Sequence, residues 1–344
     1  MNRSTLHRTT YICTAKMLSL NPQQIIKISY FLEVFFFAFF IKKYRKKAPF
    51  LLCVGEFFFF VKIIYMSRFL FLLISIGIYC CQAAYGQEYV RRTFKDTRVI
   101  NTHTVETIQA RKLDLRIGHR FGDLKGGWQS FYGLDNAQDI LIGVDYGLTD
   151  NINVGLNRTK GAGPLTRLVN TTLKYRFLRQ SDESPISATG LGIWSISTMQ
   201  KDERNEFVLN NFQQFSHRFI FAGQILISRK FSERFSLQLF PSYVHRNIVG
   251  FEEANGIFSV GFATRFQLTK VLGIIVDSTI PIGNDMTNAA TGIGLEIDTG
   301  GHVFQVNFTN ARGAIETDYI PNTQATWGNG EIRLGFTISR VFNL

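Results

Sequence analysis

Apolar and polar residues alternate with a period of two over most of the chain after residue 112. Val169, Leu173 and Phe177, for example, lie on the opposite parity to Lys174 and Arg176. Successive side chains of a strand point to opposite faces of a sheet, so this period predicts strands with one apolar and one polar face. Twelve such segments are predicted, at 112–121, 138–147, 152–159, 167–178, 186–198, 215–229, 235–246, 256–268, 272–281, 291–298, 302–310 and 331–342.

The lengths of these segments and of their connections favour a membrane barrel over a soluble β-sandwich. Several segments run to about 10–13 residues, whereas strands of soluble proteins are commonly about 5–6 residues long and a tilted strand that spans a bilayer needs about 9–11. Short connections such as 148–151 and 299–301 alternate with longer ones such as 122–137 and 311–330, with 160–166 an exception. The sequence therefore predicts an all-β fold, an antiparallel up-and-down transmembrane β-barrel of about 12 strands over 112–344.

The charge distribution argues against a nucleic-acid binder. The whole chain has a net charge of +12, but residues 1–65 hold ten Lys or Arg and two Glu. Residues 87–344 hold 27 basic and 24 acidic residues, a net charge of only +3. No nucleic acid is therefore expected as a partner, since the basic excess that would bind phosphates lies outside the patterned region.

Residues 66–86 have the order of a secretory signal peptide. Met66 is followed by the basic Arg68, an apolar run over 69–80, and small residues at Ala84 and Gly86 before Gln87. This order of regions is typical of a cleavable signal. We hypothesise that translation starts at Met66 and that 1–65 is a non-native upstream extension from a mis-called start; the alternative is a membrane-associated leader. The predicted location is the outer membrane of a Gram-negative cell.

All four cysteines precede residue 87, so no disulfide or thiolate chemistry is available to the mature chain. Segment 87–111 is polar and weakly patterned. It is assigned to the periplasmic side, either as a flexible arm or as a plug of the lumen. Loop 311–330 is the leading candidate for external recognition or for folding inward.

Several short motifs resemble an uncharacterised family of secreted, membrane-bound β-barrel proteins of unknown function. They are Val105-Glu106-Thr107, the stretch from Arg116 to Gly122, Gly133-Leu134-Asp135, Asp145-Tyr146-Gly147 and the stretch from Leu173 to Gln180. The resemblance covers roughly 95–344. It implies an outer-membrane barrel and supplies no catalytic residue.

The polar face of a membrane barrel lines its lumen, because a charge on the lipid side is costly. The candidate lumen-lining residues are Asp114, Arg116, Lys174, Arg176, Arg218, Arg265, Asp277, Glu296 and Arg333. They are interpreted either as internal ion pairs that fill a narrow barrel or as a charged constriction that selects solutes. A pair between Arg265 and Asp277 is hypothesised, on a hairpin that turns near Lys270.

These patterns favour a narrow passive, porin-like channel for small solutes. The alternative is a non-conducting structural or adhesion barrel whose external loops bind partners. An enzyme is disfavoured, because the histidines show neither metal-ligand spacing nor a serine partner on the same face. No catalytic, cofactor or metal residue is assigned. The expected partners are outer-membrane lipid, the barrel-assembly machinery, which would read the apolar last strand, and small solutes.

Overall fold

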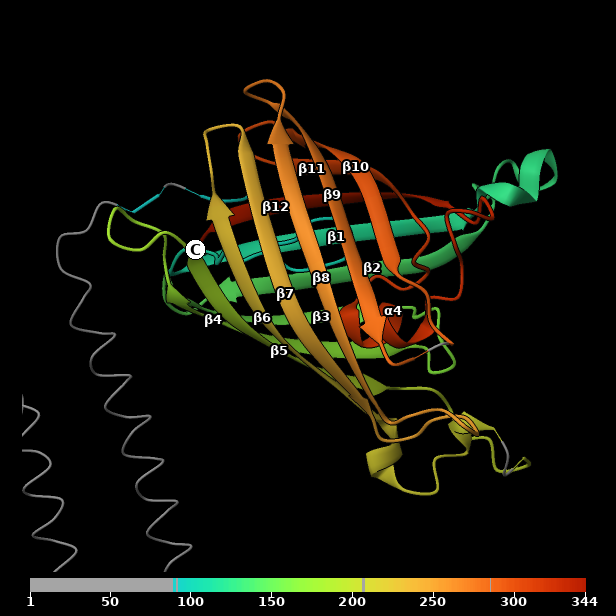
Figure 1. The fold of residues 1–344 in the computed structure, drawn as a ribbon. Helices are drawn as coiled ribbons and strands as arrows, with labels where there is room; N and C mark the ends of the chain where they lie inside the picture. The colour runs from blue at the N-terminus through green and yellow to red at the C-terminus, as the bar shows by residue number, and fades with distance from the viewer. Residues whose placement is uncertain (1–88, 91, 206–207, 285) are drawn as a thin grey trace, which may run out of the picture. The chain divides into compact units, whose positions relative to one another are not determined.

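The computed structural model describes residues 89–344 except 91, 206, 207 and 285. The predicted upstream extension and signal peptide lie outside the described residues. Twelve antiparallel strands form one closed sheet, in which each strand pairs with its neighbours in sequence and β1 pairs with β12 (Figure 1). The strands are β1 (Lys112–Asp123), β2 (Ala137–Gly147), β3 (Ile152–Thr159), β4 (Leu168–Leu178), β5 (Ser187–Ser197), β6 (Phe219–Lys230), β7 (Phe235–Arg246), β8 (Gly256–Gln267), β9 (Leu272–Ile282), β10 (Ala290–Asp298), β11 (Val303–Thr309) and β12 (Arg333–Asn343).

The closed 12-stranded barrel confirms the predicted fold class. Closure matters in a membrane because an open edge would leave backbone groups without hydrogen-bond partners in hydrocarbon. The closing register places Ile117 opposite Ile338 and Arg116 opposite Ser339, so apolar residues meet on one face and polar residues on the other. The sheet thus keeps the two-faced pattern around its whole circumference.

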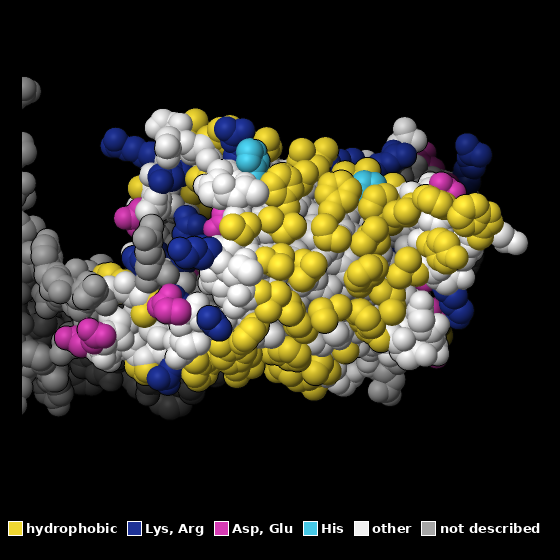
Figure 2. All heavy atoms as spheres, turned by 90° about the horizontal axis from the view of Figure 1, so that it is seen from above, with side chains coloured by type: hydrophobic (Ala, Val, Ile, Leu, Met, Phe, Trp, Pro, Cys, Tyr) yellow, Lys and Arg dark blue, Asp and Glu magenta, His cyan; other side chains and the backbone are white. Residues whose placement is uncertain are grey.

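The outer surface of the barrel is apolar and the inner surface is largely polar. Leu156, Ile142 and Leu239 are each more than half exposed on the outside, and apolar side chains form a broad band over the strands in Figure 2. In the described residues, no helix is long and apolar enough to cross a bilayer.

The helices are short and belong to the connections. They are η1 (Leu124–Ser130), η2 (Leu209–Asn211), η3 (Phe215–Arg218) and α4 (Glu316–Asn322). Helix α4 lies inside the barrel, where it contacts β5 to β9 (Figure 1). Loop 311–330 therefore folds inward over part of its length, one of the two roles the sequence left open for it. Its residues Tyr319 and Ile320 are about 1–2% exposed.

Residues 93–106 lie inside the barrel and do not form a periplasmic arm. They form a tight hairpin, in which Val99 N–H donates to Thr102 O and Thr104 N–H donates to Thr97 O, both at 2.9 Å. We call residues 93–106 the luminal hairpin. The chain enters beside the turn after β4, where Val90 N–H donates to Gln180 O, and leaves beside the turn after β2, where Arg111 N–H donates to Gly147 O. The hairpin therefore enters from the end of the barrel that carries the short turns.

An apolar cluster occupies one side of the lumen. It joins apolar residues of the luminal hairpin, the inward-facing apolar residues of β5 to β9, and α4 with its neighbours. Its main members are Phe94, Val99, Val105, Leu191, Ile193, Ile220, Leu226, Phe240, Val244, Ile257, Ile275, Ile315, Tyr319 and Ile320. This half of the interior is packed like the core of a soluble protein. The period-two pattern did not predict it, because Phe240 and Val244 are apolar on the inward parity.

Candidate functional site: the occupied lumen

The backbone of the luminal hairpin is bound by side chains of the barrel wall. Gln238 of β7 accepts from Val105 N–H at 2.9 Å and donates to His103 O at 2.8 Å. Thr189 of β5 donates to Val105 O at 2.9 Å. A buried backbone group without a partner is costly, so polar inward-facing side chains allow an irregular segment to lie inside the barrel.

The tip of the hairpin is bound by Asp277 of β9. Its carboxylate accepts from Asn101 N–H at 2.6 Å, from Asn101 Nδ2 at 2.7 Å and from Thr102 N–H at 3.2 Å. Asp277 is about 1% exposed. Among the described residues, no basic group forms an ion pair with Asp277. The three N–H donors satisfy its carboxylate instead, and they allow this acid to lie buried inside the barrel.

The hypothesised pair between Arg265 and Asp277 is wrong. The register of β8 and β9 places Ala263, not Arg265, opposite Asp277. Arg265 Nε instead donates to Glu296 Oε1 of β10 at 2.6 Å. The side chain of Arg265 reaches across β9 to the next strand, where the long guanidinium finds a carboxylate on the same inward face.

Arg116 joins the hairpin to β1. Its guanidinium donates to both oxygens of Asp96, one of them at 2.9 Å, and to Asp114 Oδ2 at 3.0 Å. All three side chains are buried. Two-point contact between arginine and a carboxylate is among the stronger polar interactions in proteins, so this group is a principal anchor of the hairpin.

Lys174 and Arg176 of β4 bind the hairpin near the short-turn end. Lys174 Nζ donates to Thr97 O at 3.2 Å and to Glu106 O at 2.8 Å. Arg176 lies 3.8 Å from Glu106 Oε2 and donates to Asp150 O at 2.9 Å. Both basic groups of β4 therefore face hairpin oxygens.

The remaining two candidates lie near the end of the barrel with the longer loops. Arg333 donates to Asn310 O at 2.8 Å and to Asp123 Oδ2 at 2.9 Å. The pattern placed Arg218 in a strand. In the structure Arg218 is instead the last residue of η3, because β6 begins only at Phe219. It donates to Ser197 O at 3.0 Å and to Met199 O at 2.7 Å, and therefore supports loop 198–218.

The luminal hairpin and the inward-folded loop meet at Glu316. The Glu316 carboxylate accepts from Arg98 Nη2 at 3.3 Å, from His103 N–H at 3.0 Å and from His103 Nδ1 at 2.8 Å. Arg98 also donates to Ala314 O at 2.9 Å. Segments that enter the lumen from opposite ends are thus joined by one buried carboxylate.

The electrostatic state of this junction follows from burial and from Arg98. Burial lowers the pKa of His103 to about 4, so its imidazole is neutral at pH 7. Burial alone would raise the pKa of Glu316, but the hydrogen bonds from His103 and the charge of Arg98 outweigh it and lower that pKa. Glu316 is therefore ionised and forms an ion pair with Arg98.

Arg120 and Asp318 were not among the predicted residues, whereas the inward parity of Asp139 was expected from the pattern. Arg120 donates to Ile100 O at 3.3 Å, to Asn101 Oδ1 at 2.7 Å and to the carbonyl of Gly313. It has the same parity on β1 as Asp114 and Arg116, so extending that pattern would have identified it. Asp139 accepts from Gly161 and Ala314, and Asp318 accepts from Ala162 and Gly163, at 2.8–2.9 Å. These two acids join loop 160–166 to loop 311–330.

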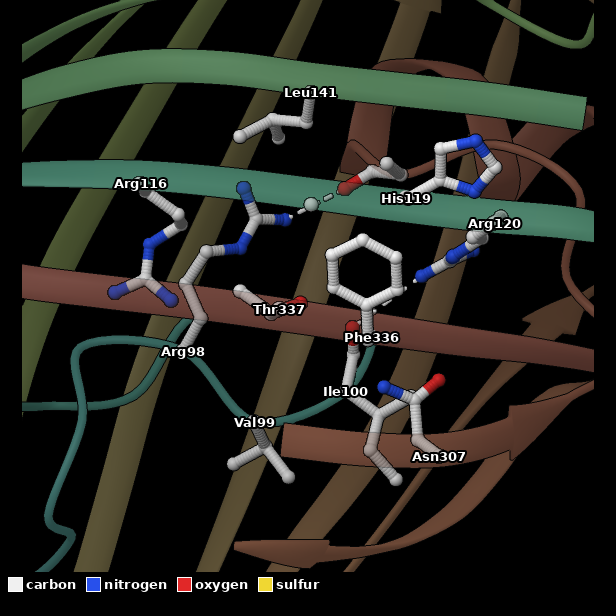
Figure 3. A pocket seen from close by; sticks show the side chains of 12 residues that line it. Arg98, Val99, Ile100, Arg116, His119, Arg120, Leu141, Asn307, Phe336 and Thr337 are labelled. Carbon is white, nitrogen blue, oxygen red and sulfur yellow. Dashed lines mark hydrogen bonds between the residues drawn. The ribbon is translucent and has the colours of Figure 1, made fainter. Parts of the chain in front are cut away.

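A small cavity remains beside the hairpin, with a volume of about 30 Å³. Arg98, Arg116, Arg120, Gly118 and Asn307 are among the residues that line it, and Figure 3 shows Arg98 next to Arg116, with Phe336 drawn between Arg98 and Arg120. A cavity of this size holds one or two water molecules. Charged side chains elsewhere in the lumen are also almost inaccessible, with Glu296 2% and Glu316 0% exposed. The luminal hairpin and α4 therefore shield the charged wall residues around them from solvent.

Known proteins were compared with the chain by sequence and by structure. No curated protein matches the chain. Among solved structures, the NanC porin has a TM-score of 0.41 and 8% identity, covering 67% of this chain and 99% of that one. Omp33 of Acinetobacter baumannii has a TM-score of 0.36 and 8% identity over 68% of this chain and 100% of that one. An outer-membrane channel of Pseudomonas putida has a TM-score of 0.37 and 13% identity, covering 69% and 98%. These scores are too low to transfer a function.

A family model matches directly and covers the hairpin together with the barrel. Its description is membrane bound beta barrel domain (DUF5777), and it matches residues 94–342. A closed antiparallel barrel with an apolar outer surface is the architecture of proteins of the outer membrane, where this protein is located. The chain belongs to the membrane bound beta barrel domain (DUF5777) family, as its sequence motifs suggested.

Proposed function

We propose that this protein is a narrow, porin-like channel for small solutes, and that the structure represents its closed state. The luminal hairpin and α4 occupy the path, and a solute passes when the hairpin is displaced. The barrel-assembly machinery and outer-membrane lipid remain the partners proposed for insertion, with β12 and its Phe342 as the segment that the machinery reads.

The observation that carries this proposal is the polar contact between the hairpin and one half of the wall. Arg116, Arg120, Lys174 and Asp277 all bind the hairpin through hydrogen bonds. Water can replace such bonds, each of which involves a charged group and contributes about 1.5–3 kcal/mol to stability. The same polar groups leave a wall that water and ions can occupy once the hairpin is displaced, as a channel requires.

A second function is favoured by the other half of the lumen. The apolar cluster between β5 to β9, α4 and the hairpin would be costly to expose to water. A non-conducting barrel that displays its external loops to partners is therefore the alternative. The two functions differ in one measurable property, which is ionic current through the lumen.

Replacing Asp277 with alanine tests the channel. The change leaves the N–H groups of Asn101 and Thr102 without their carboxylate. Because leaving a buried donor unpaired costs about 1–3 kcal/mol, displacement of the hairpin becomes easier and the open fraction rises about tenfold or more. Single-channel recording in a planar bilayer measures this fraction directly.

The matched control is Ser259→Ala. Ser259 is an inward-facing, buried residue of β8 whose hydroxyl finds no hydrogen-bond partner in the described part of the chain. Its removal should leave the open fraction unchanged. If Asp277→Ala inserts into the bilayer and remains silent, the channel proposal fails and the non-conducting barrel is favoured.

A further inference from the structure

Four basic side chains of the wall hold the luminal hairpin, and every hairpin atom that they contact is an oxygen. Arg176, Lys174, Arg116 and Arg120 contact the carboxylates of Glu106 and Asp96, the carbonyls of Thr97, Glu106 and Ile100, and the side-chain oxygen of Asn101. All four basic residues are at most 9% exposed. Arg176 and Lys174 lie toward the short-turn end, and Arg120 lies toward the other end. Together they form a basic track along the polar half of the lumen.

The carboxylates of Asp96 and Glu106 in the hairpin lie where the basic side chains of this track would bind a free anion. Asp96 binds Arg116 at two points, as a free carboxylate binds a guanidinium. Glu106 lies beside Arg176. Arg265 and Arg246 also face inward, but they pair with Glu296 of the wall and Glu253 of a loop, and not with the hairpin. The basic groups that depend on the hairpin are therefore those of the track.

Displacement of the hairpin changes the charge that a solute meets. Arg116 keeps only Asp114 as a partner, and Lys174 and Arg176 lose their hairpin oxygens. The wall acids that remain nearby are Asp114, Asp139, Asp145 and Asp277, and Asp139 of β2 lies opposite Arg120. Asp114 stays bound to Arg116, so the excess of basic groups is greatest at Lys174 and Arg176. A desolvated guanidinium or ammonium without an anion is costly, which favours entry of an anionic solute.

We propose that the basic track is a path for small organic anions that carry carboxylate groups, and that the luminal hairpin occupies it as a tethered substitute for such a solute. This inference rests on the proposed channel function. A carboxylate that binds Arg116 or Lys174 competes with Asp96 or with the hairpin carbonyls, and it therefore favours the displaced hairpin. The solute thus opens the path that it uses.

The first test measures ion selectivity in the Asp277→Ala chain, which gives the open state. We expect reversal potentials in a KCl gradient to show preference for the anion. Adding Lys174→Gln and Arg176→Gln should lower the ratio of anion to cation permeability about threefold or more, because both changes remove positive charge from a narrow path. The matched control, Arg246→Gln, removes an inward basic group that does not contact the hairpin and should change the ratio little.

The second test measures hairpin displacement without current. Thr102→Cys places a thiol at a buried position of the hairpin, and the labelling rate at position 102 is read by mass spectrometry of that peptide. We expect citrate to raise this rate about fivefold or more by shifting the population toward the displaced hairpin, and sucrose to leave it unchanged. The rise should be lost in the Lys174→Gln/Arg176→Gln chain.

The outcomes separate the two proposals. If the channel conducts without anion preference and citrate does not change labelling, the track is wrong while the channel stands. If every variant is silent, the channel fails. A silent barrel whose labelling still responds to citrate retains the track as an anion-binding site, and a silent barrel without that response loses both.

Discussion

Glu316→Ala is expected to lower the free energy of unfolding by about 3–5 kcal/mol, the cost of leaving one member of a buried ion pair without its partner. Glu316 is fully buried and binds Arg98 and both N–H groups of His103 that face it. Without the carboxylate, the carbonyls of Asn101 and Ala314 are the acceptors left to Arg98 in the described part of the chain. The unfolding curve in urea, followed by tryptophan fluorescence in vesicles, measures the effect.

The same change should also release the contact between the luminal hairpin and loop 311–330. Thiol labelling at position 102 in a Thr102→Cys chain should become faster in the Glu316→Ala background. The control is Glu331→Ala, in which a partly exposed carboxylate that accepts from Thr326 N–H is lost at the barrel mouth. It should alter neither measurement appreciably. Unchanged stability and labelling in Glu316→Ala would show that the two luminal segments are held independently.

Arg265→Ala should destabilise the barrel by a similar amount, about 3–5 kcal/mol, because it leaves Glu296 buried and unpaired. Glu296 is 2% exposed, and its Oε1 accepts from Arg265 Nε at 2.6 Å. Protonation of the carboxyl would limit the loss, so the difference between Arg265→Ala and the parent should shrink as the pH falls. Urea unfolding at several pH values measures it.

The double variant Arg265→Met/Glu296→Leu separates the charge from the packing. Replacing both partners by apolar residues of similar volume removes the buried charge altogether, so most of the lost stability should return. If the double variant is as unstable as Arg265→Ala, the loss arises from packing around β8 to β10 and not from an unpaired carboxylate.

The barrel could be predicted from the sequence because a period of two is a local signal. Each strand needs only its own residues to show it, and the predicted segment 152–159 coincides with β3. The largest difference between a predicted and an observed strand start is in segment 215–229. Its alternation extends over η3, whereas β6 begins only at Phe219. There the loop keeps the parity of the strand while its backbone forms a 3-10 helix.

The contents of the lumen could not be predicted in the same way. Segment 87–111 has no clear period, and the luminal hairpin within it bonds to distant side chains such as Gln238 and Asp277 and not to a neighbouring strand. The partners of Arg265 and Asp277 could not be predicted either, because they depend on how far each side chain reaches across the sheet. The inward parity of Arg116 could be assigned from the pattern, whereas its contact with Asp96 required the fold.

Conduction through the proposed channel depends on one movement, displacement of the luminal hairpin from the wall. Gly292 of β10 offers a way to prevent it, because a Cβ at this position would lie 2.7 Å from Ile100 Cγ2 at the hairpin tip. Because Cγ2 is bonded to Ile100 Cβ, the two Cβ atoms lie within reach of a disulfide, in which they are about 3.5–4.5 Å apart, so Ile100→Cys with Gly292→Cys can form one. The natural cysteines all precede residue 87 and supply no competing thiol within the barrel.

The most direct measurement is therefore current through a single barrel that carries Ile100→Cys, Gly292→Cys and Asp277→Ala, recorded before and after a reductant is added. We expect no current in the oxidised form and discrete conductance steps after reduction. Both single-cysteine chains should conduct before and after the reductant is added. Equal currents in the oxidised and reduced forms would contradict this expectation, because ions would then pass without displacement of the hairpin.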